Sequence, residues 1–295
     1  MQYDLGNKQN ILKSGLVPRT IRRWQSCLHV IVIVDKLIIF AKKLLVNEIA
    51  LKVRILLISS IKVKETFKSL GADLVGIAQI ERFSDAPEGF RPTDIYRRCK
   101  SVIVFAKKLP SECLFASNCV PYTHVNNIMI KEVDRLGIMA SLMLEKHGVK
   151  AVPIPSDDPY EHWEPERSYG RAILSLRHAG YLAGLGVLGR NTLLMNKDYG
   201  NMIMLGAVLV DIELEGDPIA AYEGCPPDCR LCIDSCPQGA LDGKTVNQQL
   251  CRPLSNYRAE KGYILMKCNL CRKICPNCLG IKRKPGRNIA STLRT

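Results

Sequence analysis

Eight cysteines lie between residues 225 and 275 of this 295-residue chain, and their spacing is typical of metal-cluster ligands. Residues 225–237 read CPPDCRLCIDSCP, and residues 268–276 read CNLCRKICP. Each segment ends in C-x2-C-x3-C-P, which matches the cysteine run of proteins that hold 4Fe–4S clusters in pairs. The pattern predicts two 4Fe–4S clusters and a chain that transfers electrons.

The spacing also predicts which thiolates share a cluster. A short loop wraps only three corners of a cubane, so the cysteine of each Cys-Pro pair reaches the other cluster. Crossed ligation assigns the first cluster to Cys225, Cys229, Cys232 and Cys275. It assigns the second cluster to Cys236, Cys251, Cys268 and Cys271. Three residues rather than two separate Cys225 from Cys229, which makes Cys278 the reserve ligand.

Zinc and disulfides are the competing interpretations of these cysteines. A structural zinc site uses four ligands and leaves both Cys-Pro pairs unexplained. Thirteen cysteines is an odd number, and we find no secretory signal at the start of the sequence. We therefore expect a reducing, cytoplasmic location. The cysteines at 27, 99, 113 and 119 are expected to be small buried apolar residues.

The net charge of +14 is concentrated at the two ends of the chain. Residues 1–64 hold 12 Lys and Arg against 3 acidic residues, and residues 258–295 hold 10 against 1. Basic ends can meet RNA phosphates, tRNA included, or an acidic electron-transfer partner. The alternative is a basic extension over residues 1–60 and a solvated basic tail over residues 281–295. Charged residues interrupt every apolar run, so we expect no membrane span.

The middle of the chain alternates helix and strand patterns. Helices are expected at 63–70, 125–147 and 173–183, the second with apolar residues Ile128, Val133, Leu136, Met139 and Met143 at helical spacing. Strands are expected at 72–78, 101–106, 150–154, 191–196 and 202–214. A loop is expected from residue 155 to about residue 167. These segments predict an α/β domain over residues 61–218, followed by a cysteine module over residues 219–280.

A glycine motif at residues 184–189, GLGVLG, satisfies G-x-G-x-x-G literally. A dinucleotide fingerprint needs a strand before the glycines and a helix after them, and here the expected order is the reverse. Gly184, Gly186 and Gly189 permit close backbone approach either to a flat cofactor or to packed protein atoms. Arg190 and Asn191 follow as polar groups at the end of the loop, and we include both as candidate cofactor contacts.

The sequence resembles the epoxyqueuosine reductase family and, more distantly, the corrinoid-dependent reductive dehalogenases. Three features carry the resemblance: AGLGVLGRNTLLM over residues 183–195, the Tyr199-Gly200 turn with the strand LGAVLVD over residues 205–211, and the double cysteine module with Cys251 between its halves. The resemblance implies an α+β protein in which a reductase-like domain precedes a bacterial two-cluster ferredoxin-like module. It also implies cobalamin between them and an external donor of the ferredoxin or flavodoxin type.

The sequence departs from the family pattern at three positions. The acidic residue that the family carries before the glycine loop is replaced here by Gly170, while Val187 and Arg190 replace the family's Trp and Lys. Reduction of an epoxide or carbonyl leaves an oxyanion that needs a proton donor. His178 and Tyr199 are the candidates we select for this catalytic role.

Three functional hypotheses follow from these features. The leading hypothesis is an iron–sulfur oxidoreductase that passes electrons through two clusters to a bound cofactor and substrate. The alternative is a non-catalytic, ferredoxin-type electron-transfer protein. An RNA-binding protein that uses its basic ends is a third hypothesis.

Overall fold

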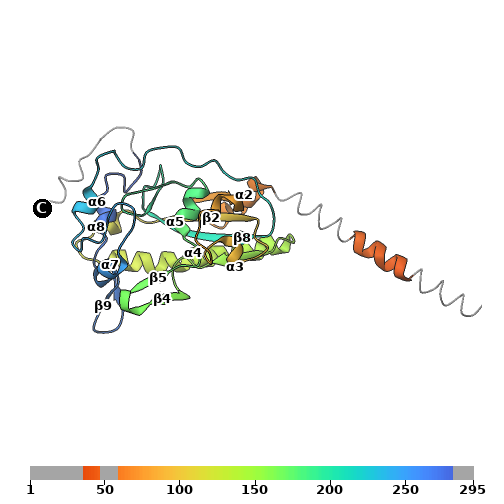
Figure 1. Ribbon diagram of the computed structural model, residues 1–295, viewed down its shortest axis with the longest axis horizontal. Helices are drawn as coiled ribbons and strands as arrows, with labels where there is room; N and C mark the ends of the chain where they lie inside the picture. The colour runs from red at the N-terminus through yellow and green to blue at the C-terminus, as the bar shows by residue number, and fades with distance from the viewer. Residues whose placement is uncertain (1–35, 47–58, 282–295) are drawn as a thin grey trace, which may run out of the picture. The chain divides into compact units, whose positions relative to one another are not determined.

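The computed structural model describes residues 36–46 and 59–281 (Figure 1). Residues 36–46 form a helix whose side chains are exposed, and this helix belongs to a different compact unit from residues 59–281. Most of the expected basic extension, and the expected tail from residue 282 onward, lie outside the described residues. The elements discussed below all belong to residues 59–281.

A four-stranded sheet with the order β1-β2-β8-β3 is the centre of this part of the chain (Figure 1). Its strands are β1 (Leu74–Gln79), β2 (Ser101–Lys108), β8 (Ile203–Val210) and β3 (Ala151–Ile154). The two longest strands, β2 and β8, pair along all eight residues, and every pairing in the sheet is antiparallel. The expected mixture of helices and strands is confirmed.

Helices cover both faces of the sheet. Helices α2 (Ser60–Ser69) and α4 (Val120–Lys146) pack on one face, and α5 (Leu176–Leu182) packs on the other. Because side chains alternate along a strand, Ile103 and Phe105 join the first core while Val102 and Val104 join the second. Burial on both faces explains why the sequence of β2 is a continuous apolar run.

The long helix α4 covers the helix expected at 125–147 and begins five residues earlier. Its buried apolar residues include Val133, Leu136, Ala140 and Leu144. Of the apolar residues at helical spacing, Val133 and Leu136 are buried, whereas Ile128 and Met139 are 50% and 39% exposed. The small residues Gly137 and Ala140 let the helix approach the sheet closely. A Cβ placed on Gly137 would lie 3.4 Å from the Phe105 ring.

Shorter elements connect the sheet to its helices. They are η2 (Ile80–Phe83), α3 (Pro92–Ile95), η3 (Glu112–Leu114) and η4 (Pro165–Arg167). The expected loop from residue 155 to about residue 167 contains strand β4 (His162–Glu164), which pairs with β5 (Tyr169–Arg171). The strand expected at 191–196 shortens to β7 (Leu194–Met195), paired with β6 (Val187–Leu188).

The cysteine-rich residues 219–280 contain short elements. They are α6 (Leu231–Asp234), α7 (Gln248–Ser255), β9 (Tyr257–Arg258), β10 (Ile264–Leu265) and α8 (Leu270–Lys273). The three helices gather at one end of the sheet region, near the start of α4 (Figure 1). Met266 N donates a hydrogen bond to Thr123 Oγ1 of α4 at 3.0 Å, which joins the cysteine module to the helix.

Among the helices that the structure describes, none has the length and apolar character of a membrane span.

Candidate active site and cysteine module

The first predicted set of thiols is brought together by the fold. Burial raises the pKa of the Cys232 thiol, and the neighbouring Cys225 and Cys229 raise it further. Burial also raises the pKa of Cys275 to about 12, with added contributions from Cys225, Cys278 and Cys232. The four thiols assigned to the first cluster therefore lie near one another, although Cys225 and Cys275 are 50 positions apart in the sequence. Cys278, the reserve ligand, lies beside Cys275.

Three of the four thiols in the second set are likewise neighbours. Burial raises the pKa of Cys271 to about 11, Arg272 opposes this shift, and Cys251, Cys268 and Cys232 add to it. For Cys236, the fourth thiol of this set, the described contact is a hydrogen bond that its Sγ accepts from Ala240 N at 3.3 Å. Cys232 influences thiols of both sets, so the two groups of cysteines adjoin.

The cysteines form neighbouring groups without a closed metal shell. No disulfide joins the cysteines that the structure describes. Within residues 36–46 and 59–281, no three His, Cys, Asp or Glu side chains converge closely enough to hold a single metal ion. The assignment of the eight cysteines to two clusters stays a prediction.

The glycine loop packs tightly against protein atoms. Helix α5 precedes the loop and β6 and β7 follow, which is the order expected from the sequence and not that of a dinucleotide site. A Cβ on Gly184 would collide with the Pro218 carbonyl, and one on Gly186 with the Met195 carbonyl. On Gly189 a Cβ would meet the Met195 sulfur. In the described structure, these three glycines therefore pack closely against other protein atoms.

Arg190 and Asn191 connect the glycine loop to the cysteine module. The Arg190 guanidinium donates hydrogen bonds to the carbonyls of Pro227 and Cys229, the latter at 2.7 Å, and Arg190 N donates to Cys225 Sγ at 3.4 Å. Asn191 Nδ2 donates to the Cys271 carbonyl at 3.1 Å. These two residues therefore contact the segments that carry both predicted cysteine sets. Their predicted contact with a cofactor remains a prediction.

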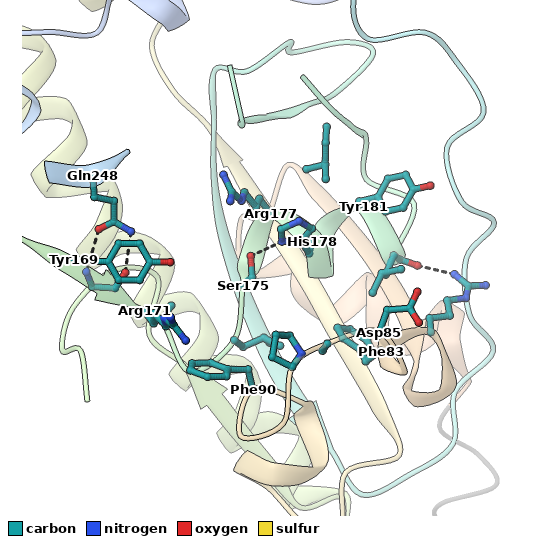
Figure 2. A pocket seen from close by; sticks show the side chains of 18 residues that line it. Phe83, Asp85, Phe90, Tyr169, Arg171, Ser175, Arg177, His178, Tyr181 and Gln248 are labelled. Atoms are coloured by element: carbon teal, nitrogen blue, oxygen red, sulfur yellow. Dashed lines mark hydrogen bonds between the residues drawn. The ribbon is translucent and has the colours of Figure 1, made fainter. Parts of the chain in front are cut away.

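A pocket of about 740 Å³ opens on the α5 side of the sheet. Figure 2 shows Tyr169 and Gln248 on one side of it, with Asp85 and Tyr181 on the other. Phe83 and Phe90 add aromatic surface, while Arg82, Arg171, Arg177 and His178 make the lining predominantly basic. Of the glycine-loop residues, Leu188 lines the pocket. A cavity of this size that combines aromatic and aliphatic surface with polar groups is typical of small-molecule sites.

His178, a candidate selected from the sequence, lines this pocket. Its Nδ1 lies 2.7 Å from Ser175 Oγ (Figure 2). Burial lowers the pKa of His178 below its usual value, and the nearby positive charge of Arg177 lowers it further. The imidazole is therefore mainly neutral at pH 7, and its protonated form becomes populated only under more acidic conditions.

Tyr199, the other sequence candidate, is not among the residues that line the pocket. Its ring packs against the core on the α5 side of the sheet and lies 5.7 Å from Lys108 Nζ. The structure therefore separates Tyr199 from His178 and supports only a packing contact at that position.

Gly170, where the family pattern has an acidic residue, lies in the pocket wall. Gln248 of α7 pairs with its backbone on both sides, accepting from Gly170 N at 3.0 Å and donating to Gly170 O at 2.9 Å. A Cβ on Gly170 would lie 3.2 Å from Trp163 and 3.3 Å from Arg252. The wall is therefore closed by a helix of the cysteine module. Sequence reasoning missed this contact because the residues lie 78 positions apart.

Sequence reasoning also missed Asp85, a carboxylate in the pocket lining. It follows η2 and is followed by Ala86 and Pro87, which also line the pocket. No motif surrounds it, and only the tertiary arrangement of η2 and α5 places it in the pocket that His178 also lines. A search for carboxylates in turns that follow the first strand could have included it.

Comparisons with known proteins support the resemblance. No protein-family model matches the chain. The epoxyqueuosine reductase of Staphylococcus aureus is 28% identical over 247 residues, which cover 72% of this chain and 63% of that protein. That of Bacillus subtilis is 24% identical over 251 residues, covering 72% of this chain and 61% of that protein. The chain thus spans less than two thirds of the length of these curated relatives.

The fold is shared with solved structures of two kinds. The epoxyqueuosine reductase from Streptococcus thermophilus aligns with a TM-score of 0.53 and 19% identity, covering 76% of this chain and 67% of that one. A reductive dehalogenase, described in terms of B12-dependent dehalogenation, aligns with a TM-score of 0.55 and 19% identity. That alignment covers 79% of this chain and 33% of the dehalogenase. The chain is therefore similar in sequence to epoxyqueuosine reductases, and it has the fold that they share with reductive dehalogenases.

Proposed function

We propose that the chain is an iron–sulfur oxidoreductase of the epoxyqueuosine reductase type. In this proposal the cysteine module holds two 4Fe–4S clusters and supplies electrons to a substrate in the 740 Å³ pocket. The observation that carries the proposal is the placement of α7. This helix holds Cys251, a predicted cluster ligand, and three residues earlier it contributes Gln248 to the pocket wall.

The cysteines fit the donor set of two clusters. Cys225, Cys229, Cys232 and Cys275 would hold the first cluster. Their proximity, seen in the effect of neighbouring thiols on the pKa of Cys232 and of Cys275, supports this assignment. Cys251, Cys268 and Cys271 would hold the second together with Cys236. Iron–sulfur clusters supply one-electron transfer at potentials that depend on nearby hydrogen bonds. Arg190 N, directed at Cys225 Sγ, and Ala240 N, directed at Cys236 Sγ, would provide such bonds.

The basic lining of the pocket suits a reaction that develops negative charge on oxygen. Fixed positive groups directed at a developing oxyanion stabilise a transition state more than its ground state. Arg171 and Arg177 are the groups in position to do this. His178 would deliver a proton, and since its pKa is lowered, activity through imidazolium should increase as the pH falls below neutral.

The substrate class follows from the relatives' name. Curated relatives are called epoxyqueuosine reductases, so we propose an epoxide on a modified nucleoside as the substrate. Phe90, Tyr169 and Tyr181 give the pocket the aromatic surface on which a base can stack. A tRNA that carries the base is the partner we propose for the basic ends, with a ferredoxin or flavodoxin as donor in the cytoplasm.

We include a corrinoid in the proposal because the chain shares its fold with a reductive dehalogenase described in terms of B12-dependent dehalogenation. The pocket between α5, β5 and η2 offers apolar and basic surface for part of such a group, and Leu188 is the glycine-loop residue that would touch it. When bound, a corrinoid supplies a strongly reducing cobalt centre. The residues of the chain would orient it and exclude water.

Anaerobic purification with metal counting tests this proposal. The chain is expressed with iron and a corrinoid supplied, and iron, sulfide, cobalt and zinc are measured per chain. About eight irons are expected. The purified protein, with a reduced donor, should then convert epoxyqueuosine in tRNA to queuosine, and Arg177→Gln should slow the conversion.

The possible results separate the alternatives. Fewer than four irons with zinc present would overturn the assignment of the cysteines to clusters. About eight irons with no corrinoid uptake and no turnover would overturn the reductase proposal and leave the electron-transfer protein. Binding to tRNA that weakens steeply with salt, without iron, would support the RNA-binding protein instead.

A further inference from the structure

A second, smaller pocket of about 230 Å³ shares Arg177 with the pocket described above. Its apolar lining comes from α5 and β8, with Leu176 and Leu205 as examples. Its polar lining consists of five residues drawn from distant parts of the chain: Ser156, Arg177, Thr192, Asn201 and Arg272. Arg177 lines both pockets. The smaller volume suits one small polar group, whereas nucleosides and cofactors need larger sites.

Two guanidinium groups face this pocket without a neutralising carboxylate. The lining contains no Asp or Glu, and within the described residues neither Arg177 nor Arg272 takes part in an ion pair. Arg177 donates to the Thr192 carbonyl at 2.9 Å, and Arg272 donates to the Asn201 carbonyl. Ser156 N donates to Asp134 at 2.8 Å, and Asp134 is not part of the lining. Arg177 and Arg272 are half-buried, and Arg272 also lowers the pKa of the nearby Cys271 thiol. The pocket therefore presents two guanidiniums and no carboxylate, a lining that suits an anion.

The Asn201 side chain points to the same conclusion. Asn201 is 1% exposed, and neither its Oδ1 nor its Nδ2 has a hydrogen-bond partner in the described structure. Buried amides are almost always hydrogen-bonded, so an orphaned one in a pocket wall can bond to a ligand or to an ordered water. Its backbone is already satisfied, since Asn201 N donates to the Cys278 carbonyl at 3.2 Å and Asn201 O accepts from Arg272. Only the side chain is left to bind something else.

Backbone strain at Thr192 is a third observation. Thr192 has a φ of 65°, a left-handed conformation that a β-branched residue rarely adopts. The Thr192 carbonyl accepts a hydrogen bond from the Arg177 guanidinium, which holds that guanidinium at the pocket. Such strain is found where a site must be preorganised.

We propose that this pocket binds a phosphate group. Arg177 and Arg272 would each donate to phosphate oxygens, and guanidinium forks match that geometry. Asn201 Nδ2 would donate to a further oxygen, while its Oδ1 would accept from a P–OH or a bound water. The phosphate can be the free ion or the phosphate of a larger molecule, and the two share the same recognition chemistry. The proposal does not rest on the proposed reductase activity, although Arg177 lines both pockets and takes part in both proposals.

Phosphate binding to the full-length, iron-loaded chain tests the proposal. Isothermal titration uses inorganic phosphate, ribose 5-phosphate and, as a neutral control, ribose. Phosphate or ribose 5-phosphate should bind saturably at one site, and ribose should not. Tighter binding of ribose 5-phosphate indicates the phosphate of a larger molecule, whereas equal or tighter binding of inorganic phosphate indicates the free ion. Arg177→Gln should weaken binding about tenfold or more, because it removes a charge-assisted contact. The matched control Arg135→Gln removes an exposed guanidinium on α4 and should leave binding unchanged.

Asn201→Asp keeps the proposal testable if other variants fold poorly. This nearly isosteric change places a carboxylate between the two guanidiniums. It should abolish phosphate binding and raise the melting temperature, since it supplies the missing negative charge. A merely structural Asn201 would instead give a lower melting temperature. Absence of saturable binding by both phosphates, or equal affinities of Arg177→Gln and Arg135→Gln, would overturn the proposal.

Discussion

The sheet region and the cysteine module are stabilised in different ways. The sheet is buried on both faces by apolar side chains from α2, α4 and α5. Among residues 219–280, the buried apolar side chains are Cys232, Ala240, Leu241, Cys275 and Cys278, three of which are cysteines. The helices α6 and α8 have four residues each. Elements this short, without a core, need ligands or a neighbouring domain to fold. The sheet region can therefore fold on its own packing. The module relies on that region, with which Cys275 and Cys278 share a buried cluster, and on the iron–sulfur clusters that we propose for its thiols.

Loss of a central thiol is the largest effect that this comparison predicts. Cys232 influences thiols of both sets, so Cys232→Ser should remove about four of the expected eight irons and destabilise the second cluster. Hydrogen exchange should become faster across residues 219–280 and stay unchanged in β2 and β8. Iron and sulfide counts with exchange mass spectrometry provide the measurement.

Cys99→Ala is the matched control for this prediction. Cys99 is 5% exposed and packs within the core of the sheet, where burial raises its pKa to about 11. The variant should keep all its iron and lose only a little stability. Equal iron loss in the two variants would show that the comparison between core and module is wrong.

Overpacking the sheet should give the opposite pattern. A Cβ on Gly76 of β1 would collide with the Ala183 carbonyl, which cannot move without shifting the end of α5. Gly76→Ala should therefore lower the free energy of unfolding by about 3 kcal/mol while the folded protein keeps its iron. Chemical denaturation of the anaerobic protein measures the change.

The control for Gly76 is another glycine beside the sheet. Gly137→Ala places its Cβ 3.4 Å from the Phe105 ring, an ordinary contact, in the middle of α4. Since alanine favours a helix interior, this variant should be neutral or more stable by about 0.5–1 kcal/mol. A similar loss in both variants would show that the position of the glycine does not matter.

The contrast also explains how far sequence reasoning reached. Continuous apolar runs predicted the strands at 101–106 and 202–214, because a strand buried on both faces has a local signature. The loop expected from residue 155 was wrong in part, since β4 is a three-residue strand with exposed side chains and little pattern. The spacing of the cysteines predicted two sets of thiols; Cys225, Cys229, Cys232 and Cys275 are neighbours, while the division into two clusters stays a prediction. The contact between Gln248 and Gly170 depends on how distant segments pack, so no local sequence pattern predicts it.

Arg190 tests the connection between the two regions. Arg190→Ala removes the hydrogen bonds to the Pro227 and Cys229 carbonyls, so docking of the first cysteine segment should weaken by about 1–2 kcal/mol. Iron release to a chelator should become about tenfold faster. Arg190→Lys keeps the charge and should recover part of the loss. No change in the alanine variant would mean that the contact does not stabilise the module.

The smallest expected effect concerns His178 on the sheet side of the pocket. Its pKa is lowered in the folded state, first by burial and then by Arg177. The folded protein therefore binds fewer protons at this residue than the unfolded chain, and the stabilisation is present above the unfolded pKa of about 6.5. It should be lost as the pH falls below that value. His178→Gln removes the titration, so the free energy of unfolding of the variant should fall less steeply than that of the wild type between about pH 7 and pH 5. Denaturation at a series of pH values, with His147→Gln as a control histidine outside the pocket, measures the two slopes. A steeper fall in the His178 variant would mean that the imidazole is stabilised in its charged form, which would reverse its proposed environment in the pocket.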